Sequence, residues 1–199
     1  MSRYPKEDML YDGDELAWYG VGQYPASSGL SAAKDEERLR SEGKAGPPLE
    51  GRNAAFQQIS DEGPIPEGLY SLRLKIAGKA TVDAQGKLDT RQGIESLVEM
   101  PGPNGQLYES PDWGKNRVRL NAIIISDAKA RRRGGFYLHD SLKGFTHGCI
   151  EVDPRFFTRL REEAQRQQSR KHGRSELILK VKYPTETAST YGGTARTAD

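Results

Sequence analysis

The residues of this sequence best suited to covalent chemistry lie in one short stretch around its single cysteine. Cys149 follows His147 by two positions, and His139 lies ten residues upstream, so two of the three histidines flank the cysteine. A thiol with a pKa near ~8.5 is mostly protonated at neutral pH, and a histidine within hydrogen-bond reach can take its proton. Cys149 is therefore a candidate nucleophile, with His139 as its candidate general base.

The spacing of this pair suits a nucleophile and its base. Ten residues allow a strand, a loop and a return, so the side chains of His139 and Cys149 can face each other. Gly148 keeps the approach to the sulfur open, and a turn flanked by glycine can direct backbone N–H groups at a developing oxyanion.

Two other interpretations of these residues stay open. A single cysteine is commonly an inert, buried, small hydrophobic side chain. Zinc is the second alternative, because histidine, cysteine and aspartate bind it. The residues concerned are His139, Asp140, His147 and Cys149. Because His-x-Cys is not a usual chelating spacing and no second cysteine exists, we predict no metal site and no cofactor. His172 lies in a basic stretch and is expected at the surface.

Composition favours a single domain with a mixed surface charge. The 199 residues fit one domain, and 30 basic against 28 acidic residues give a net charge of only +2, which does not favour a nucleic-acid partner. The longest apolar run, Ala122–Ile125, is far shorter than the ~20 residues of a membrane-spanning helix. The N-terminus has no apolar run after a basic start, so we expect no secretory signal peptide and no membrane span.

Hydrophobic patterning predicts a mainly β protein with one helix after the cysteine. Leu72, Leu74 and Ile76 alternate with polar residues, as in a half-buried strand. Helical spacing follows Asp153, which can cap a helix. The apolar positions of this helix are Phe156, Phe157, Leu160 and Ala164. The expected strands are 10–11, 16–19, 69–76, 96–100, 118–126, 136–139 and 177–181, and the expected helix is 154–170. The predicted architecture is a compact sandwich or barrel-like sheet.

Three segments are expected to lie outside the sheet. Residues 20–30 are rich in glycine and serine and are predicted to form a loop. Residues 31–51 are dense in charged residues, glycine and proline, and are expected to form a mobile surface segment with a short helix over Ala32–Arg40. The tail, 184–199, is rich in serine, threonine and glycine and is expected to be disordered.

The sequence T-H-G-C-I over residues 146–150 resembles the [S/T]-H-G-C-hydrophobic signature of the L,D-transpeptidase superfamily. This signature is far more specific than a bare pair of cysteine and histidine. The short form H-D-S…T-H-G-C-I-E over residues 139–151, with D-E-G-P-I-P-E-G-L-Y over residues 61–70, resembles a narrower group. That group is the L,D-transpeptidase effectors delivered by bacterial type VI secretion. Residues 18–29 are similar to its first hairpin.

The resemblance implies a fold and a domain layout. The fold is an L,D-transpeptidase-like β-sandwich or barrel with one helix packed after the catalytic cysteine. The layout is an N-terminal extension over 1–9, a catalytic domain over 10–183 with a mobile insertion at 31–51, and a tail over 184–199. The likeness runs from Leu10 to Lys182 and is weaker over 31–51 and 77–87.

The resemblance also assigns roles to individual residues. It implies that Cys149 is the nucleophile and His139 the general base, with Asp140 holding the imidazole through its carbonyl or side chain. The backbone N–H groups of Gly148 and Cys149 form the implied oxyanion hole. Pocket-shaping and loop-shaping roles are implied for Tyr137, Ser141, Thr146, His147 and Glu151. Glu151 replaces the Asn or Arg of housekeeping transpeptidases, so their donor and acceptor preferences do not transfer directly.

The activity implied by the resemblance is acyl transfer on bacterial peptidoglycan. The Cys149 thiolate attacks an L,D amide carbonyl in a stem tetrapeptide and releases the terminal D-residue. Water then gives an L,D-carboxypeptidase, whereas a free D-amino acid or another stem amine gives the exchange or cross-linking of an L,D-transpeptidase. The implied partners are peptidoglycan stem peptides, a cognate immunity protein and type VI secretion components. The implied route is synthesis in the cytoplasm and secretion into the target-cell periplasm.

Three alternatives to an antibacterial effector stay open. An endogenous cell-wall-remodelling L,D-transpeptidase has the same chemistry, and a signal sequence in the full gene would favour it. A catalytically inactive peptidoglycan-binding module needs no nucleophile, so the intact pair of cysteine and histidine argues against it. A general cysteine peptidase would be identified by cleavage of ordinary L,L peptides.

Overall fold

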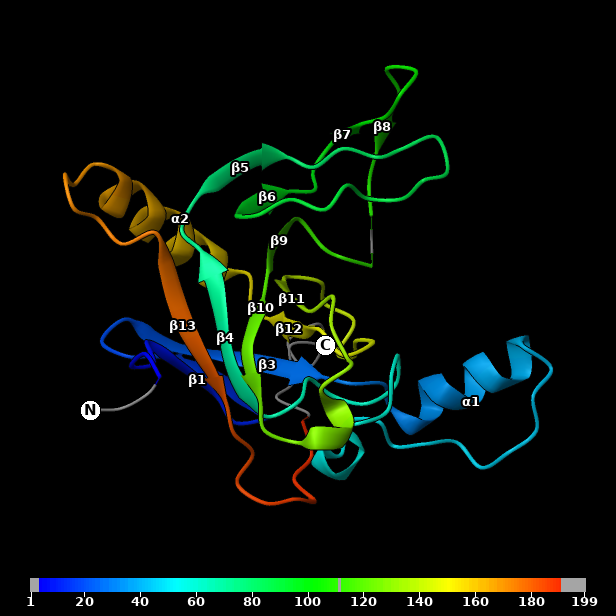
Figure 1. Ribbon diagram of the computed structural model, residues 1–199. Coiled ribbons are helices and arrows are strands. Elements are labelled where there is room, and N and C mark those ends of the chain that lie inside the picture. Colours follow the sequence, from blue (N-terminus) through cyan, green and yellow to red (C-terminus); the bar gives the residue numbers. More distant parts are fainter. Residues whose placement is uncertain (1–3, 111, 191–199) are drawn as a thin grey trace.

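The computed structural model describes residues 4–110 and 112–190 and shows a mainly β protein (Figure 1). Within these residues one mixed sheet contains eleven strands, and β7 pairs with β8 in a second sheet. The strands are β1 (Met9–Tyr11), β2 (Glu15–Trp18), β3 (Gly22–Ser28), β4 (Gly68–Arg73), β5 (Ile76–Lys79), β6 (Ile94–Ser96), β7 (Met100–Pro101), β8 (Leu107–Tyr108), β9 (Asn116–Arg119), β10 (Asn121–Ile125), β11 (Tyr137–His139), β12 (Ile150–Val152) and β13 (Glu176–Val181). The helices are α1 (Ala32–Ser41) and α2 (Arg155–Gln168), with short 3-10 helices η1 (Ala54–Phe56) and η2 (Ala128–Ala130). The mainly β class predicted from the sequence is confirmed, and α2 follows the cysteine as expected.

The strand order shows that the large sheet curls back on itself. The order is β10-β4-β13-β1-β2-β3-β12-β11-β9-β6-β5, so β9 and β10 lie near opposite ends of the sheet. Only Leu120 separates these two strands along the chain. One residue spans at most about 3.6 Å, so the two halves of the sheet must approach each other, and β4 indeed contacts β9. The curled sheet encloses the main apolar core.

Helix α2 covers this core through the four apolar positions predicted from the sequence, all of which are buried. The ring of Phe156 contacts the rings of Trp18 on β2 and Tyr24 on β3, at centroid distances of 5.7 Å and 5.4 Å. Burying a side chain of this size stabilises the fold by about 1.5–3 kcal/mol, so α2 is firmly attached to these strands. Asp153 was predicted to cap this helix, but Pro154 occupies the N-cap position and makes no side-chain capping bond. Asp153 lies one residue earlier and accepts a hydrogen bond from the backbone N–H of Arg155 at 2.8 Å.

Residues 20–30, predicted to be a loop, instead contain β3 at the centre of the sheet. This strand pairs with β2 on one edge and with β12 on the other. Tyr24 and Ala26 are buried in the core, and Ser27 and Ser28 are buried as well. The prediction from composition was wrong because pairing on both edges satisfies the backbone of a strand that lacks strong β-formers. This central position matters for the site, since β12 begins immediately after Cys149.

Three predicted strands are divided by local backbone features. The strand expected over 69–76 is divided into β4, which ends at Arg73, and β5, which begins at Ile76 and lies near the opposite end of the sheet. The strand expected over 96–100 is absent: β6 ends at Ser96, β7 begins at Met100, and Glu99 between them has a positive φ of 49°. The strand expected over 118–126 is divided at Leu120 into β9 and β10, which belong to different halves of the sheet. Amphipathic patterning found these apolar runs but not the bends within them.

The described part of the C-terminal tail, 184–190, is packed against the domain. Thr190 is fully buried, and its N–H donates to the carbonyl of Arg52 at 2.8 Å. Ser189 forms an isolated bridge with Asn53. The expectation of disorder was therefore wrong for these seven residues, because tertiary contacts rather than composition decide their order. The rest of the predicted tail, 191–199, and the start of the predicted extension, 1–3, lie outside the described residues.

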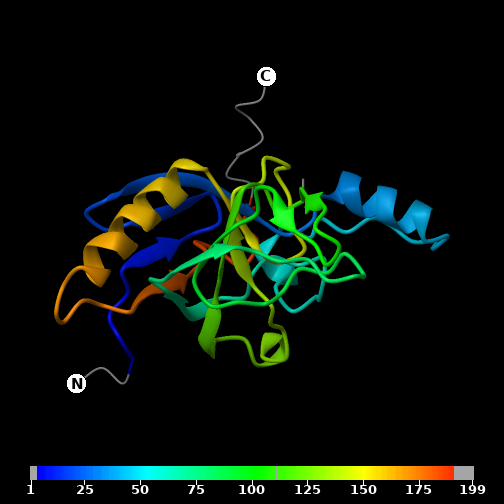
Figure 2. The same ribbon diagram turned by 90° about the horizontal axis from the view of Figure 1, so that it is seen from above.

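Helix α1 coincides with the helix expected over Ala32–Arg40. Its single buried residue is Asp35, so it has no apolar face against the sheet. Figures 1 and 2 show it projecting from the body of the protein, away from α2. The mobility expected for residues 31–51 stays a prediction.

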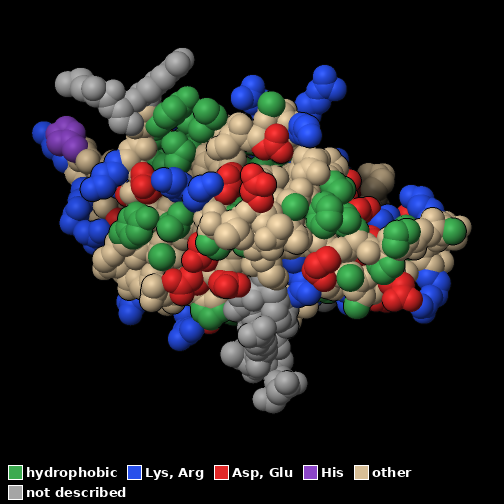
Figure 3. Space-filling view, turned by 90° about the horizontal axis from the view of Figure 1, so that it is seen from below, with side chains coloured by type: hydrophobic (Ala, Val, Ile, Leu, Met, Phe, Trp, Pro, Cys, Tyr) green, Lys and Arg blue, Asp and Glu red, His purple; other side chains and the backbone are tan. Residues whose placement is uncertain are grey.

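The surface carries both signs of charge. Figure 3 shows acidic and basic side chains interspersed with small hydrophobic patches on the face seen from below. No helix formed by the residues that the structure describes is long and apolar enough to cross a membrane.

Candidate active site

Cys149 and His139 are brought together by two neighbouring parallel strands. In the register of β11 with β12, His139 lies beside Glu151 and Leu138 lies beside Ile150. Cys149 immediately precedes β12. Side chains alternate along a strand, so His139, Cys149 and Glu151 lie on one face of the sheet, and the apolar pair lies on the core face. The parallel register therefore puts the predicted nucleophile and base on the same surface.

This surface opens into a cavity of about 540 Å³. Cys149 is partly exposed, whereas His139 is only 3% exposed. The cavity is lined by predicted residues and by residues that the sequence analysis did not assign to the site. The predicted residues are His139, Thr146, His147 and Cys149. The others are Leu30, Lys34, Glu37, Arg38, Ser41, Asp112, Trp113, Lys143 and Phe145. One wall of the cavity is thus formed by α1, the helix within the predicted insertion.

His139 and Cys149 share this cavity without a direct hydrogen bond between them, as far as the described residues show. Apo enzymes often have long catalytic hydrogen bonds that tighten only when substrate binds. Both residues lie at neighbouring strands of the same sheet and line the same cavity.

Burial raises the pKa of the Cys149 thiol to about 11. The backbone N–H of Tyr137 and the positive charges of Arg117, Arg133 and Lys143 act in the opposite direction and lower it. The resting group at neutral pH is therefore the thiol, which needs a base at the moment of attack. These four groups are placed to stabilise the thiolate once it forms.

Burial lowers the pKa of His139 to about 3, and the charges of Lys143 and Arg117 lower it further, whereas Asp112 raises it. The imidazole is therefore neutral at neutral pH and has a lone pair available for a proton. The Trp113 ring packs against it at a centroid distance of 5.3 Å, which restricts its rotation.

The carboxylate of Asp140 does not contact the His139 ring. It accepts hydrogen bonds from the backbone N–H groups of Lys115 and Asn116, at 2.6 Å and 2.7 Å, and from Asn116 Nδ2 at 2.7 Å. The holding role that the resemblance implied for its side chain is therefore not seen, because this carboxylate ties the end of β11 to the start of β9. Ser141 is the side chain at the imidazole instead: its Oγ lies 3.2 Å from His139 Nδ1.

Glu151 is fully buried and holds the loop between the two strands. Its carboxylate accepts a very short hydrogen bond from the Ser141 hydroxyl. It also accepts hydrogen bonds from the backbone N–H groups of Lys143, at 3.0 Å, and Gly144, at 2.7 Å. The Glu151 carboxylate therefore holds three residues of the loop beside the imidazole, Ser141, Lys143 and Gly144.

Thr146 organises the loop that carries the nucleophile. Its hydroxyl donates to the carbonyl of Cys149 at 2.6 Å and accepts from the N–H groups of Gly29, at 3.1 Å, and Gly148, at 3.2 Å. The Gly148 N–H, one of the two predicted oxyanion donors, is therefore directed at a protein oxygen. It would have to exchange this partner for a substrate oxyanion.

Arg133 supports the nucleophile loop, and the sequence analysis did not assign it to the site. Its guanidinium donates to the carbonyls of Gln57 at 2.5 Å, Pro64 at 2.6 Å and Gly63 at 3.0 Å. Gly148 has a φ of +103°, and a Cβ added there would lie 2.3 Å from Arg133 Nη2. A glycine before the cysteine is thus required both by its backbone conformation and by this close approach.

A row of buried polar side chains crosses the sheet beside the cavity. In register, Glu151, His139, Arg117 and Glu95 come from β12, β11, β9 and β6, and each is at most 3% exposed. Arg117 Nε donates to Glu95 Oε2 at 2.7 Å, and its guanidinium lies over the ring of Tyr137 at 4.8 Å. No local motif marks Arg117 or Glu95. Once the pairing of β11, β9 and β6 is known, the alternation of side chains along these strands places Arg117 and Glu95 on the same face as His139.

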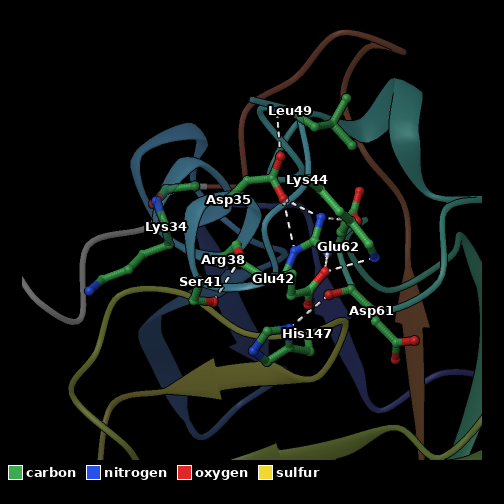
Figure 4. Close-up of polar contacts among 11 residues, drawn as sticks. Lys34, Asp35, Arg38, Ser41, Glu42, Lys44, Leu49, Asp61, Glu62 and His147 are labelled. Carbon is green, nitrogen blue, oxygen red and sulfur yellow. Dashed lines mark hydrogen bonds and ion pairs between the residues drawn. The ribbon is translucent and has the colours of Figure 1, made fainter. Parts of the chain in front are cut away.

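Polar contacts link α1 to the nucleophile loop (Figure 4). Arg38 on α1 contacts Glu62 Oε1 at 2.5 Å and Asp35 Oδ1 at 2.7 Å. The neighbouring carbonyl of Asp61 accepts a hydrogen bond from His147 Nδ1 at 2.7 Å. The turn at 61–62 is therefore a shared support for α1 and for the loop of Cys149.

The described residues contain no group of three or more His, Cys, Asp or Glu side chains suited to hold a metal ion. The donor types around Cys149 instead suit nucleophilic catalysis, with one thiol, one neutral imidazole and a hydrogen-bonded support for its ring. No protein-family model matches the sequence, and no curated protein matches it at a significant level.

Proposed function

We propose that this chain is a cysteine acyl-transfer enzyme that acts on peptidoglycan stem tetrapeptides as an L,D-carboxypeptidase, an L,D-transpeptidase, or both. The observation that carries the proposal is the position of Cys149 and His139 on one face of adjacent strands, opening into one cavity. The resemblance of residues 146–150 to the L,D-transpeptidase signature supports the choice of substrate.

The proposed reaction has two steps that use the same pair. His139, a neutral imidazole, takes the Cys149 proton as Sγ attacks the carbonyl carbon of the scissile amide. The tetrahedral oxyanion collapses to a thioester, the C–N bond breaks, and the imidazolium gives its proton to the departing amine of the terminal D-residue. Water or an amine then attacks the thioester, His139 takes a proton from this second nucleophile, and the thiol is restored.

The walls of the cavity suit a peptide with free carboxylates. The ammonium groups of Lys143 and Lys34 lie 4.7 Å and 5.6 Å from the ring centroid of Phe145, on residues that line the cavity beside Cys149. They form exposed ion pairs with Asp112 and Glu37. Such exposed pairs are worth at most about 1 kcal/mol, so a substrate carboxylate can replace the acidic partners. Stem tetrapeptides end in a D-residue with a free carboxylate.

We propose further that the enzyme is an antibacterial effector delivered by type VI secretion into the periplasm of a target cell. The support is the resemblance of residues 139–151 and 61–70 to that effector group. Loss of tetrapeptide donors would weaken normal cross-linking in the target. A cognate immunity protein in the producing cell would then block the cavity.

A mass-spectrometric digest of purified muropeptides tests the activity. Wild type is expected to convert tetrapeptide stems to tripeptides or to exchange the terminal D-residue, and Cys149→Ala is expected to do neither. His172→Gln, an exposed substitution far from the motif in sequence, is the matched control and should act like wild type. If all three proteins leave the stems intact while binding the sacculus, a binding module replaces the proposal. If wild type cleaves ordinary L,L peptides equally well, a general cysteine peptidase does.

A further inference from the structure

The His139 ring is held by a chain of two hydrogen bonds that runs through Ser141 to Glu151. Ser141 lies two residues after His139, on the same face of the chain, and its Oγ is 3.2 Å from His139 Nδ1. The same oxygen makes a very short hydrogen bond to Glu151 Oε2. His139, Ser141 and Glu151 are 3%, 2% and 0% exposed, so water does not compete for these contacts.

The direction of each hydrogen bond in this chain follows from proton counting. A carboxylate only accepts, so the single Ser141 hydroxyl proton is directed at Glu151. Both oxygens of Glu151 also receive backbone donors, from Lys143 on Oε2 and from Gly144 on Oε1. The Ser141 oxygen therefore presents a lone pair to His139 Nδ1, which must carry the ring proton. That leaves His139 Nε2 unprotonated.

We propose that Glu151, acting through the Ser141 hydroxyl, is a positioning residue that fixes the tautomer and orientation of His139. The unprotonated Nε2 is the atom that a general base needs in order to take a thiol proton. The assignment of the tautomer stands on the hydrogen bonds alone, whereas its importance for turnover rests on the function proposed above. This role would also explain why an acidic residue, Glu151, is buried two positions after Cys149.

The register of the sheet explains why these residues meet. His139 and Glu151 are direct neighbours in the parallel pair of β11 and β12, so the carboxylate lies on the face of the imidazole. The carboxylate bonds to the Ser141 hydroxyl, which lies between it and the imidazole nitrogen. A hydroxyl between the carboxylate and the ring orients the imidazole, and burial together with the charges of Lys143 and Arg117 keeps the imidazole neutral by lowering its pKa.

The tautomer is measured directly by ¹⁵N NMR of protein labelled at histidine, without any substrate. The His139 signals are identified by their loss in His139→Gln. Wild type is expected to carry the proton on Nδ1. Ser141→Ala removes the relay but leaves both backbone donors on Glu151, so it should lose this tautomer preference, and Ser141→Thr should restore it. A wild-type ring protonated on Nε2, or an unchanged tautomer in Ser141→Ala, overturns the proposal whether or not the stems are substrates.

A double-mutant cycle separates positioning from loop support. Ser141→Ala and Glu151→Gln are each expected to lower kcat roughly 10- to 100-fold with a smaller change in KM, as expected for loss of a buried hydrogen bond at the base. If Glu151 acts through Ser141, the Glu151→Gln effect on kcat largely disappears in the Ser141→Ala background. Additive effects that fall mainly on KM would show that Glu151 only holds the loop. If wild type is inactive but has the expected tautomer, the proposed function fails and the assignment of the relay stands.

Discussion

Replacing Arg133 with methionine should destabilise the protein far more than the same change at its neighbour Arg132. The Arg133 guanidinium donates to three backbone carbonyls, those of Gln57, Gly63 and Pro64. Hydrogen bonds that involve a charged group contribute about 1.5–3 kcal/mol each. Arg133 is only partly buried, so water replaces some of the lost donors and the lower end applies. We expect a loss of about 3–5 kcal/mol in the free energy of unfolding.

The assay is equilibrium unfolding in urea of wild type, Arg133→Met and Arg132→Met. Arg132 is exposed in the same run of arginines, so its variant controls for charge and hydrophobicity. It should change the free energy of unfolding by no more than about 0.5 kcal/mol. Because Arg133 also lowers the pKa of Cys149, Arg133→Met should slow alkylation of the thiol at neutral pH. Equal stability of the two variants would refute the view that Arg133 supports the nucleophile loop.

Three further predictions concern the loop and the reacting pair. Gly148→Ala forces a side chain into a φ of +103° and against the guanidinium of Arg133, so it should abolish catalysis and destabilise the fold by about 1–3 kcal/mol in urea unfolding; wild-type behaviour would contradict this. His139 has a folded pKa of about 3 against 6.5 in the unfolded chain, so the unfolded state binds the extra proton, and stability present above pH 6.5 is lost as pH falls towards 3. This loss amounts to at most about 5 kcal/mol, and His139→Gln should flatten the acid limb of a stability–pH curve whereas His172→Gln should not. In the absence of substrate, the rate of Cys149 alkylation should keep rising with pH up to about 11, and a plateau near pH 9 would show that burial does not raise the thiol pKa.

Much of the fold was predictable because its strongest signals are local. The helical spacing of Phe156, Phe157 and Leu160 gave α2, since one apolar face of a helix must be buried. The strand β3 was missed because most of its residues are small or polar, and what makes them a strand is pairing with β2 and β12 on both edges. Such pairing depends on segments far away in the sequence. Local composition therefore predicted the opposite.

Some residues of the candidate site could likewise be predicted from the sequence, whereas others could not. Cys149 and His139 were found from their types and spacing. The resemblance implied that Asp140 holds the imidazole through its carbonyl or side chain, but on a strand the next side chain points to the other face and the second side chain returns. Applied strictly, that rule favours Ser141, the residue whose Oγ the structure shows at Nδ1. Arg133 had no comparable signal, because the carbonyls that it supports come from a segment some 70 residues away.

The wall contributed by α1 could not be inferred at all from residues 31–51 taken alone. Its charged sequence resembles any solvated surface segment, and only Asp35 is buried. The contact that links α1 to the turn at 61–62 is the ion pair of Arg38 with Glu62, and the same turn accepts a hydrogen bond from His147 (Figure 4). Polar contacts of this kind have no periodic pattern in the sequence.

The central claim is that Cys149 forms an acyl-enzyme with a peptidoglycan stem, and intact-protein mass spectrometry tests it most directly. The protein is mixed with a purified disaccharide tetrapeptide, quenched with acid within seconds, and weighed, with Cys149→Ala treated in parallel. We predict a wild-type adduct equal in mass to the substrate less the free terminal D-amino acid, located on the peptide that contains Cys149, and no adduct on the variant. Turnover of the tetrapeptide by both proteins, or the absence of both adduct and turnover in wild type, would contradict the account.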